Sequence, residues 1–223
     1  AAFLNKRRKR LSLMVTRNAL ARLEERGITV DCPIEMVEPR QIDHRVGGDA
    51  VHQGVLLTAR ALDPLDLDDL GDARLVLALD QVTDPHNVGA ILRSAVALGA
   101  DGLITTTRHS PQESGVLAKA ASGAVDLLPH AEVTNLSKAL EALKRQGFTC
   151  VALDSAGEGR LEDVVIADRV ALVLGAEGKG VRPGVRATCD TVARLDMPGA
   201  ITSLNVSNAA VLAMYVLRNK LVG

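Results

Sequence analysis

The chain of 223 residues is 47% hydrophobic and 24% charged, a balance that excludes a disordered protein and indicates one domain or two small ones. Only 1% of the residues are aromatic, which argues against a site that stacks bases on aromatic side chains. No apolar run approaches the roughly 18 residues of a membrane span, so we expect no membrane partner. The cysteines are far apart and form no C-x-x-C pair, which indicates neither a disulfide framework nor a zinc site: Cys32, Cys150 and Cys189.

The charges are distributed unevenly along the chain, although the net charge is only −1. Residues 1–62 hold 11 Lys and Arg against 7 Asp and Glu, whereas residues 63–223 hold 15 against 20. The unpaired cysteines favour a bacterial-type cytoplasm as the location of the protein. The N-terminus is poor in acidic residues, so an organelle is the alternative location. One basic run suits contacts with RNA phosphates, with a solvated basic loop as the alternative interpretation: Lys6, Arg7, Arg8, Lys9 and Arg10.

A turn-rich, acidic stretch from Ala61 to Asp72 separates the two charge regimes. We therefore expect domains at 1–62 and 74–223, joined by a linker at 63–73. The first domain begins without an obvious first element, and we expect it to lack one. The pattern of the remaining residues predicts a small α/β unit with strands Leu11–Val15, Ile28–Cys32 and Gly54–Ala59 and helices Asn18–Arg26 and Pro39–Arg45.

In the second domain, predicted strands and helices alternate along the chain. This order predicts an α/β fold with a mostly parallel sheet covered by helices on both faces. Ligands of such sheets bind at loops beyond the carboxyl ends of the strands. The predicted strands are Leu75–Leu79, Gly102–Thr105, Phe148–Leu153, Val170–Leu174 and Val192–Leu195, and the predicted helices are Asn87–Leu98, Glu113–Ala121, Leu136–Gln146 and Val206–Lys220.

The first of three unusual loops follows Leu79 and leads into a helix that carries Asn87 and Arg93. Asn87 suits a helix N-cap, which is its structural interpretation. Arg93 lies among apolar residues, where an arginine requires a carboxylate or phosphate partner. A structural ion pair is the alternative to a functional role for Arg93.

The second loop, Gly175–Val181, follows another strand and holds three glycines, which permit close approach of the backbone to a ligand. It matches neither a Walker loop nor G-x-G-x-x-G. Its Glu177 either caps the following helix or pairs with Arg93. Lys179 and Arg182 are candidates for RNA phosphate contacts, with ordinary surface charge as the alternative.

The third loop, Pro198–Ala209, leads directly into the last predicted helix. Ser203 or Asn205 suits its N-cap, but small polar side chains are more numerous here than capping requires. They provide hydrogen-bonding groups where the backbone is also exposed. The neighbouring apolar residues suit the faces of a flat heterocycle: Leu195, Ile201 and Leu204.

Together the three loops resemble one group of enzymes. The patterns N-x-G-x-x-x-R (Asn87, Gly89, Arg93), L-G-x-E-G-x-G (Leu174–Gly180) and S-L-N-V-S (Ser203–Ser207) match the motifs of the SpoU RNA 2′-O-ribose methyltransferases in order and rough spacing. These enzymes belong to the SPOUT class, and the chain is most similar to the type that methylates guanosine in 23S ribosomal RNA. The resemblance covers about Leu75 to Leu221.

The resemblance implies a C-terminal trefoil knot, a homodimer with a site at its interface, and S-adenosylmethionine as the cofactor, with no metal. The segment His52–Val55 is similar to part of the small RNA-binding domain that precedes the catalytic domain in ribosomal RNA guanosine methyltransferases of this group. The residues implied around the cofactor are Leu174, Gly175, Gly178, Leu195, Ile201, Leu204, Ser203, Asn205 and Ser207, with Thr105 at the pocket edge.

The resemblance also implies the chemistry, which is methyl transfer to a ribose 2′-hydroxyl. Arg93 matches the arginine that the family places at the reaction. Because the pKa of arginine exceeds about 12, we expect its guanidinium to stabilise the developing 2′-oxyanion or to hold the adjacent phosphate. Asn87 and Glu177 are expected to orient Arg93 and the nucleotide, and Ser203 or Asn205 to contact the ribose or base.

Three other functions stay open at this point. A transfer-RNA ribose methyltransferase is the near alternative. A non-catalytic RNA-binding assembly factor with the same fold is the alternative from a different class, although the joint presence of Asn87, Arg93, Glu177 and Asn205 argues against lost turnover. A nucleotide-binding oxidoreductase comes third, because no dinucleotide fingerprint is present.

Overall fold

The computed structural model describes residues 1–47 and 50–222. The chain divides into two compact units, Ala1–Asp63 and Pro64–Gly223. The first unit is a three-stranded sheet with the order β2-β1-β3, in which β2 is parallel and β3 antiparallel to β1. Its elements are β1 (Arg10–Val15), α1 (Arg17–Glu25), β2 (Ile34–Met36), α2 (Pro39–Val46) and β3 (Val55–Ala59).

One predicted strand of the first unit is wrong. Residues Ile28–Cys32 form no strand, and the strand that pairs with β1 is Ile34–Met36. The apolar residues Val30 and Cys32 still pack against the core of this unit, while pairing with β1 begins only where Leu13 N donates to Pro33 O. The apolar residues of Ile28–Cys32 therefore indicate burial in the core and not pairing in the sheet.

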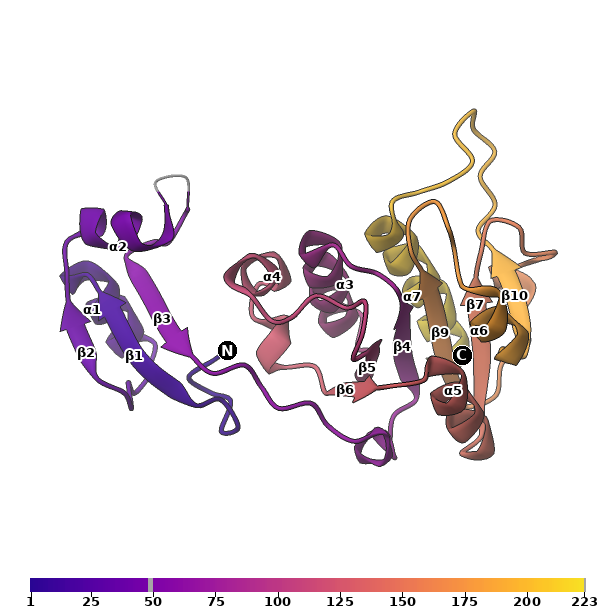
Figure 1. Cartoon of the computed structure of the whole chain (residues 1–223), viewed down its shortest axis with the longest axis horizontal. Coiled ribbons are helices and arrows are strands. Elements are labelled where there is room, and N and C mark those ends of the chain that lie inside the picture. Colours follow the sequence, from indigo (N-terminus) through magenta and orange to yellow (C-terminus); the bar gives the residue numbers. More distant parts are fainter. Residues whose placement is uncertain (48–49, 223) are drawn as a thin grey trace. The chain divides into compact units, whose positions relative to one another are not determined.

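The second unit is a seven-stranded, entirely parallel sheet with the order β6-β5-β4-β9-β7-β10-β8 (Figure 1). Three of its elements, β6, β8 and α6, were not predicted from the sequence. Its strands are β4 (Leu75–Asp80), β5 (Gly102–Thr106), β6 (His130–Val133), β7 (Phe148–Leu153), β8 (Gly159–Arg160), β9 (Arg169–Gly175) and β10 (Thr191–Arg194). Its helices are α3 (Pro85–Ala97), α4 (Gly115–Ala121), α5 (Leu136–Arg145), α6 (Pro183–Thr188) and α7 (Val206–Val222).

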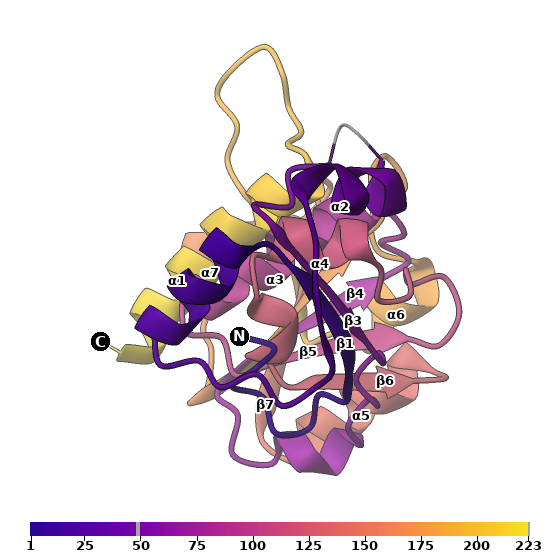
Figure 2. The same ribbon diagram turned by 90° about the vertical axis from the view of Figure 1, so that its left-hand side faces the viewer.

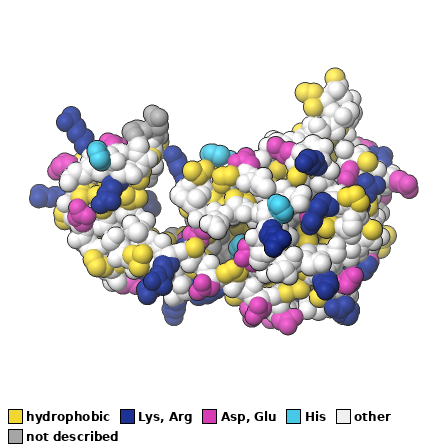
Figure 3. Space-filling view, in the orientation of Figure 1, with side chains coloured by type: hydrophobic (Ala, Val, Ile, Leu, Met, Phe, Trp, Pro, Cys, Tyr) yellow, Lys and Arg dark blue, Asp and Glu magenta, His cyan; other side chains and the backbone are white. Residues whose placement is uncertain are grey.

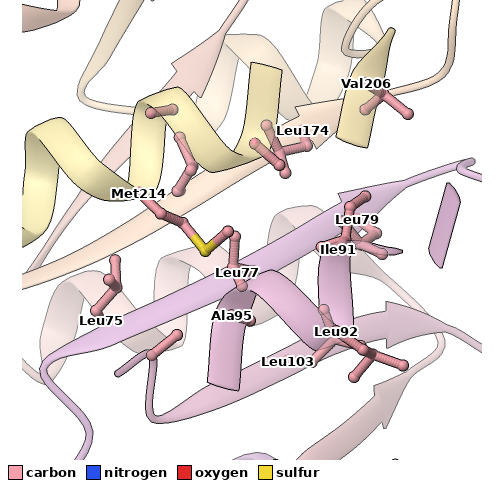
Figure 4. Packing of buried hydrophobic residues seen from close by; sticks show 14 of the residues in the cluster. Leu75, Leu77, Leu79, Ile91, Leu92, Ala95, Leu103, Leu174, Val206 and Met214 are labelled. Carbon is pink, nitrogen blue, oxygen red and sulfur yellow. The ribbon is translucent and has the colours of Figure 1, made fainter. Parts of the chain in front are cut away.

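Helices cover both faces of this sheet, as the alternation of strands and helices predicted. One buried cluster joins the sheet to α3, α4 and α7, and a second joins it to α5 and α6. Successive side chains of β4 serve the two clusters in turn, because strand residues alternate between faces. Figure 4 shows Leu77 and Leu79 of β4 beside Ala95 and Ile91 of α3, with Met214 of α7 in the same layer. Among the described residues, no helix has the length and apolarity needed to cross a membrane.

The stretch expected as a linker packs against the second unit. Leu65 forms a parallel bridge with Ala131 next to β6, and the 3₁₀ turn Leu67–Leu70 follows it. Leu70 is buried in the same cluster as α5 and lies where a side chain at Gly102 would otherwise stand. The leucines of this acidic stretch therefore pack against the second unit, while its aspartates are exposed.

The strand order places several strand ends together. The chain passes from β4 outward through β5 to β6, returns at β7, and then inserts β9 between β4 and β7. The order reverses at β4, and ligands of open parallel sheets bind at such a reversal, beyond the carboxyl ends of the strands. The segment 195–205, between β10 and α7, projects from the second unit as a long loop (Figure 1, Figure 2).

Candidate active site

Three side chains from the three unusual loops meet in one hydrogen-bonded junction. Asn87 Nδ2 donates to Glu177 Oε1 at 3.1 Å. Asn205 Nδ2 donates to Asn87 Oδ1 at 3.0 Å and to Glu177 Oε1 at 2.5 Å. The backbone N–H of Val206 donates to the same carboxylate oxygen at 3.4 Å. The junction thus joins the first turn of α3, the loop after β9 and the start of α7.

Local capping explains how two of these residues are held. The N-cap of α3 is Asp84, whose carboxylate accepts from His86 N, and Pro85 occupies the first helical position, so the interpretation of Asn87 as the cap is wrong. Asn87 lies inside the first turn, and its amide is free to reach the other loops. Asn205 Oδ1 accepts from Ser207 N at 2.9 Å and from Ser207 Oγ at 2.6 Å, so Asn205 stabilises the start of α7 and belongs to the junction as well.

The glycine-rich loop folds back on itself at the end of β9. Gly180 N donates to Ala176 O at 2.9 Å, and a Cβ on Gly175 would lie 2.0 Å from the carbonyl carbon of Gly180. Real Cβ contacts are never this short, so only glycine fits at position 175. The main chain at Gly175 therefore packs directly against the main chain at Gly180.

An ion pair between a buried carboxylate and a half-exposed guanidinium holds this loop at the end of β4. Asp80 is fully buried, and its carboxylate accepts from Arg182 N and Nε, both at 2.8 Å, with Nη2 at 2.7 Å. The guanidinium of Arg182 is therefore committed to an internal partner. The Arg182 side chain is still 46% exposed, so its contact with RNA phosphate stays a prediction.

A cavity of about 740 Å³ opens beside the junction. Its wall is formed by the loops after β7, β9 and β10 and by the first turns of α7. Eight of the residues expected at the cofactor or the reaction line it, together with Lys179, which was expected to contact RNA phosphate: Leu174, Gly175, Glu177, Gly178, Leu195, Ser203, Leu204 and Asn205. The third loop and the glycine-rich loop therefore share one pocket.

Three residues expected around the cofactor lie elsewhere. Ile201 is 77% exposed near the tip of the loop 195–205, where Figure 3 shows hydrophobic side chains on the projection. Ser207 lies outside the cavity lining and bonds to Asn205. Thr105 is buried, and its hydroxyl pairs with His130 Nε2 at 2.7 Å. Burial lowers the pKa of His130, so Thr105 belongs to a buried polar pair rather than to the pocket edge.

Arg93 differs most from its expected setting. It is exposed, it lines neither cavity, and it has no hydrogen bond or ion pair among the residues the structure describes. Its neighbours Ile91 and Leu92 face the core, whereas position 93 turns to the solvent side of α3. Glu177 bonds to Asn87 and Asn205, so it does not pair with Arg93 of the same chain, which was one of the two interpretations of Glu177.

The basic run of the first unit contains two kinds of side chain, those with partners inside the unit and those exposed to solvent. Arg8 is only 5% exposed and donates to Arg60 O at 2.9 Å. Arg10 forms an ion pair with Asp31 at 2.5 Å, which lowers the pKa of Asp31, and lies over the ring of Phe3. These two side chains are structural, contrary to the expectation of RNA contacts. The exposed members of the run are Lys6, Arg7 and Lys9, of which Arg7 donates to Asp63 O at 2.6 Å.

A second, smaller cavity of about 380 Å³ lies beside the first. Asn87 lines only this cavity, Asn205 lines only the first, and Glu177 lines both, so the junction is their common wall. The remaining residues of the smaller cavity are Gln81, Val82, Thr83, Asp84, His109, Ala176, Lys179 and Val206.

Sequence reasoning missed the contribution of β7 to the larger cavity. Asp154 and Ser155 follow this strand and line the cavity, as does Met197 from the third loop. Asp154 Oδ1 accepts from Ala156 N at 2.9 Å, which fixes its carboxylate at the turn. Asp-Ser after a buried strand was the available signal. The sequence does not show that β7 lies between β9 and β10, and this strand order is what brings Asp154 and Ser155 to the cavity.

Within the described part of the chain, no group of three or more His, Cys, Asp or Glu is arranged to hold a metal ion. Burial raises the pKa of Cys150 and Cys189 to about 12, so both thiols are protonated near neutral pH and unsuited to nucleophilic attack. The polar groups available at the junction are therefore amides, a carboxylate and backbone N–H groups.

Comparison with known proteins agrees with this arrangement. The family model described as SpoU rRNA Methylase matches residues 74–215. The chain belongs to the SpoU rRNA methylase family. All three loops of the junction lie inside the SpoU match, so the family resemblance of the motifs is confirmed.

Relatives of this SpoU chain carry specific names. It is 41% identical over 175 residues to the 23S rRNA (guanosine-2′-O-)-methyltransferase RlmB of Ralstonia nicotianae, covering 76% of this chain and 70% of the relative. It is 38% identical over 200 residues to RlmB of Xylella fastidiosa (strain 9a5c), covering 86% and 80%. Its fold resembles the SpoU methyltransferase AviRb of Streptomyces viridochromogenes in complex with AdoMet, with a TM-score of 0.82, 24% identity, and coverage of 100% and 87%.

Proposed function

We propose that the chain transfers a methyl group from S-adenosylmethionine to the ribose 2′-hydroxyl of a guanosine in ribosomal RNA. The hydrogen-bonded junction of Asn87, Glu177 and Asn205 carries the proposal, because it brings the three family motifs together between two cavities. The RlmB names of the relatives support the guanosine and the ribosomal RNA.

The larger cavity suits the cofactor. Its volume of about 740 Å³ is within the usual range for small-molecule sites. Leu174, Leu195 and Leu204 provide apolar contact for an adenine ring, and the carboxylate of Asp154 provides an acceptor for ribose hydroxyls. The exposed backbone of the glycine-rich loop adds donors and acceptors. When bound, the cofactor supplies a methyl group already activated on a sulfonium, and no metal is required.

The junction positions groups for this transfer. Glu177 Oε1 accepts three hydrogen bonds, while Oε2 has no partner among the described residues. The carboxylate is thus fixed in orientation and keeps one oxygen to accept a hydrogen bond from a ligand hydroxyl. Asn87 and Asn205 hold it between the two cavities, which preorganises the region where donor and acceptor meet.

We infer that the active site is completed in a homodimer. In this dimer, Arg93 of one protomer acts at the cavities of the other. Three observations support this inference. Arg93 is exposed and unpartnered in the described chain, and it lies off the walls of both cavities of its own protomer. Apolar side chains also stand exposed along α7: Val211, Leu212 and Tyr215. A guanidinium brought there would stabilise the developing 2′-oxyanion.

A trefoil knot in the C-terminal part of the second unit is the further structural element of the proposal. The insertion of β9 between β4 and β7 and the tight turn of Gly175 against Gly180 support it. Threading of the last segment through such a turn would hold the glycine-rich loop and the loop 195–205 together around one cofactor.

The catalytic role of Arg93 has a direct test. We expect Arg93→Ala to lower kcat by about 100-fold or more, because an electrostatic contact to the transition state is lost. Binding of S-adenosylhomocysteine, measured by calorimetry, should stay within twofold, since the proposed contact of Arg93 is with the 2′-oxygen of the acceptor and not with the cofactor. Arg145→Ala, which removes an exposed arginine from α5, is the matched control and should leave both values unchanged. Near-normal turnover of Arg93→Ala would remove Arg93 from catalysis.

The substrate is tested by mapping 2′-O-methylation of total RNA with and without the gene. Loss of one methylated guanosine in large-subunit ribosomal RNA is the expected result. Loss of a transfer-RNA site instead would favour the transfer-RNA alternative. An unchanged map would favour a non-catalytic assembly factor, and binding of NAD without S-adenosylhomocysteine would overturn the methyltransferase proposal altogether.

A further inference from the structure

We infer that the smaller cavity binds the base of the acceptor nucleotide, and that Gln81 and His109 determine which base is accepted. This inference rests on the proposed function, since it assigns the acceptor side of the same reaction. It adds two residues outside the three sequence motifs, from the loops after β4 and β5.

The position of the cavity relative to the cofactor pocket is the first argument. Four residues line both cavities: Ala176, Glu177, Lys179 and Val206. A methyl donor in the larger cavity and a nucleotide in the smaller one are therefore separated only by the junction. Methyl transfer requires donor and acceptor atoms in near contact, and an acceptor sugar at the common wall meets that requirement with its base directed into the smaller cavity.

Backbone conformation is the second argument. Gln81 and His109 have φ values of +62° and +66°, a left-handed region that side chains other than glycine rarely occupy. Only two other non-glycine residues of the described chain, Gln53 and Ser122, share this property. Such a conformation is strained for a residue with a Cβ, and glycine would avoid the strain. Two strained residues with polar side chains in one small cavity indicate that the side chains themselves are used.

Chemical complementarity is the third argument. The side chains of Gln81, His109 and Lys179 form no hydrogen bond or ion pair with any described residue. The amide of Gln81 offers both an acceptor and donors, which matches the N1–H and O6 groups on the Watson–Crick edge of guanine. His109 and Lys179 add donors for O6 and N7. RNA-binding proteins commonly read unstacked bases through these edges.

The size of the cavity fits one base and excludes a stacked helix. About 380 Å³ is near the lower end of the range for small-molecule sites. An acceptor nucleotide must therefore leave its stack to enter, as happens in other enzymes that modify nucleotides. Phe, Tyr and Trp are absent from the lining, so we expect recognition to depend mainly on hydrogen bonds.

The experiment uses the full chain, in vitro transcribed 23S ribosomal RNA and labelled S-adenosylmethionine. The variants are Gln81→Gly and His109→Gly, which remove the side chains while relieving the positive φ, so the fold should be unharmed or slightly stabilised. We expect kcat/KM for the RNA to fall at least tenfold in each variant. The dissociation constant of S-adenosylhomocysteine should stay within twofold, because neither residue lines the larger cavity.

The matched control is Gln112→Ala, which removes the same amide from an exposed position of the loop after β5, outside both cavities. It should leave all constants unchanged. Nucleosides released from the methylated RNA provide a second readout. The unmodified protein should yield 2′-O-methylguanosine alone, and Gln81→Gly should yield a detectable share of other 2′-O-methylnucleosides.

The outcomes separate this inference from the function on which it rests. A wild-type chain that methylates the transcript, with both glycine variants equal to it in kcat/KM and in product nucleoside, overturns the inference and leaves the function standing. A wild-type chain that binds no S-adenosylhomocysteine and methylates no RNA overturns both. Reduced kcat/KM at unchanged cofactor affinity supports the inference.

Discussion

The carboxylate of Asp80 and the guanidinium of Arg182 hold the glycine-rich loop at the end of β4. Every contact of Asp80 with Arg182 is between 2.7 and 2.8 Å, and the carboxylate is shielded from water. A buried charge of this kind is costly unless it is paired. The position of Glu177, five residues before Arg182, depends on this anchor.

We expect Asp80→Asn to lower the free energy of unfolding by about 3 kcal/mol, because the amide replaces an acceptor oxygen with a donor that faces the donors of Arg182. Urea titration followed by circular dichroism measures the change. The control is Asp196→Asn, which weakens the ion pairs of Asp196 with Arg160 and Arg194 at the surface and should cost less than about 1 kcal/mol. Equal effects of the two substitutions would show that the buried pair does not anchor the loop.

At this scale the sequence predicted the residues better than their contacts. Asn87, Glu177 and Asn205 were found through their motifs, yet their mutual hydrogen bonds were not, because each depends on how three loops are spaced in the fold. Arg93 was expected to lie among apolar residues and to need a carboxylate or phosphate partner. The sequence shows apolar neighbours, but only the rotation of α3 about its axis decides that position 93 meets solvent.

The contact between α3 and α4 depends on the absence of a side chain at Gly89. A Cβ at this position would lie 2.5 Å from Ala120 Cβ and 2.8 Å from Leu117 O. The second motif residue of N-x-G-x-x-x-R is therefore a packing residue, and it determines how closely the helix that carries Asn87 approaches α4.

Gly89→Ala should lower the free energy of unfolding by about 1–3 kcal/mol, because the overlap with α4 outweighs the better helix propensity of alanine. Thermal unfolding followed by circular dichroism detects the change. Gly115→Ala is the control, since a Cβ on Gly115, in α4, meets no atom within 4 Å and should be neutral or slightly stabilising. A Gly89→Ala protein as stable as the control would mean that the two helices separate without cost.

Long elements with a clear period were predicted well, and short ones were missed. The strands β4, β7 and β9 were recognised as continuous apolar runs, as expected for strands buried on both faces. Strand β8 has two residues and α6 has six, too few for a period to be visible. The insertion of β9 beside β4 was also beyond sequence patterns, because periodicity carries no information on strand order.

The two units differ in how much core each contains. The second unit holds two large clusters on the two faces of its sheet, whereas the buried cluster of the first unit consists of Leu13, Val15 and Ala19 with partly buried neighbours. Small domains bury a smaller fraction of their surface and are less stable. Both cavities are lined by residues of the second unit alone.

A protein of residues 64–223 should therefore fold and bind S-adenosylhomocysteine within twofold of the full chain. Its affinity for 23S ribosomal RNA transcript should fall at least tenfold, because the exposed cations Lys6, Arg7 and Lys9 are lost. Calorimetry measures the first value and filter binding at fixed salt the second. Unchanged RNA affinity would mean that the first unit does not contribute to RNA binding.

The close approach of Gly175 to Gly180 has a consequence for how such a protein diversifies. A ligand wall built from main chain presents the same atoms whatever mutations occur around it, and a Cβ added at Gly175 has no room. Substitution of single side chains at this wall is therefore not expected to change which cofactor the protein prefers. We expect such changes to arise instead at side chains of the loop after β10 that line the same cavity, Met197 and Thr202.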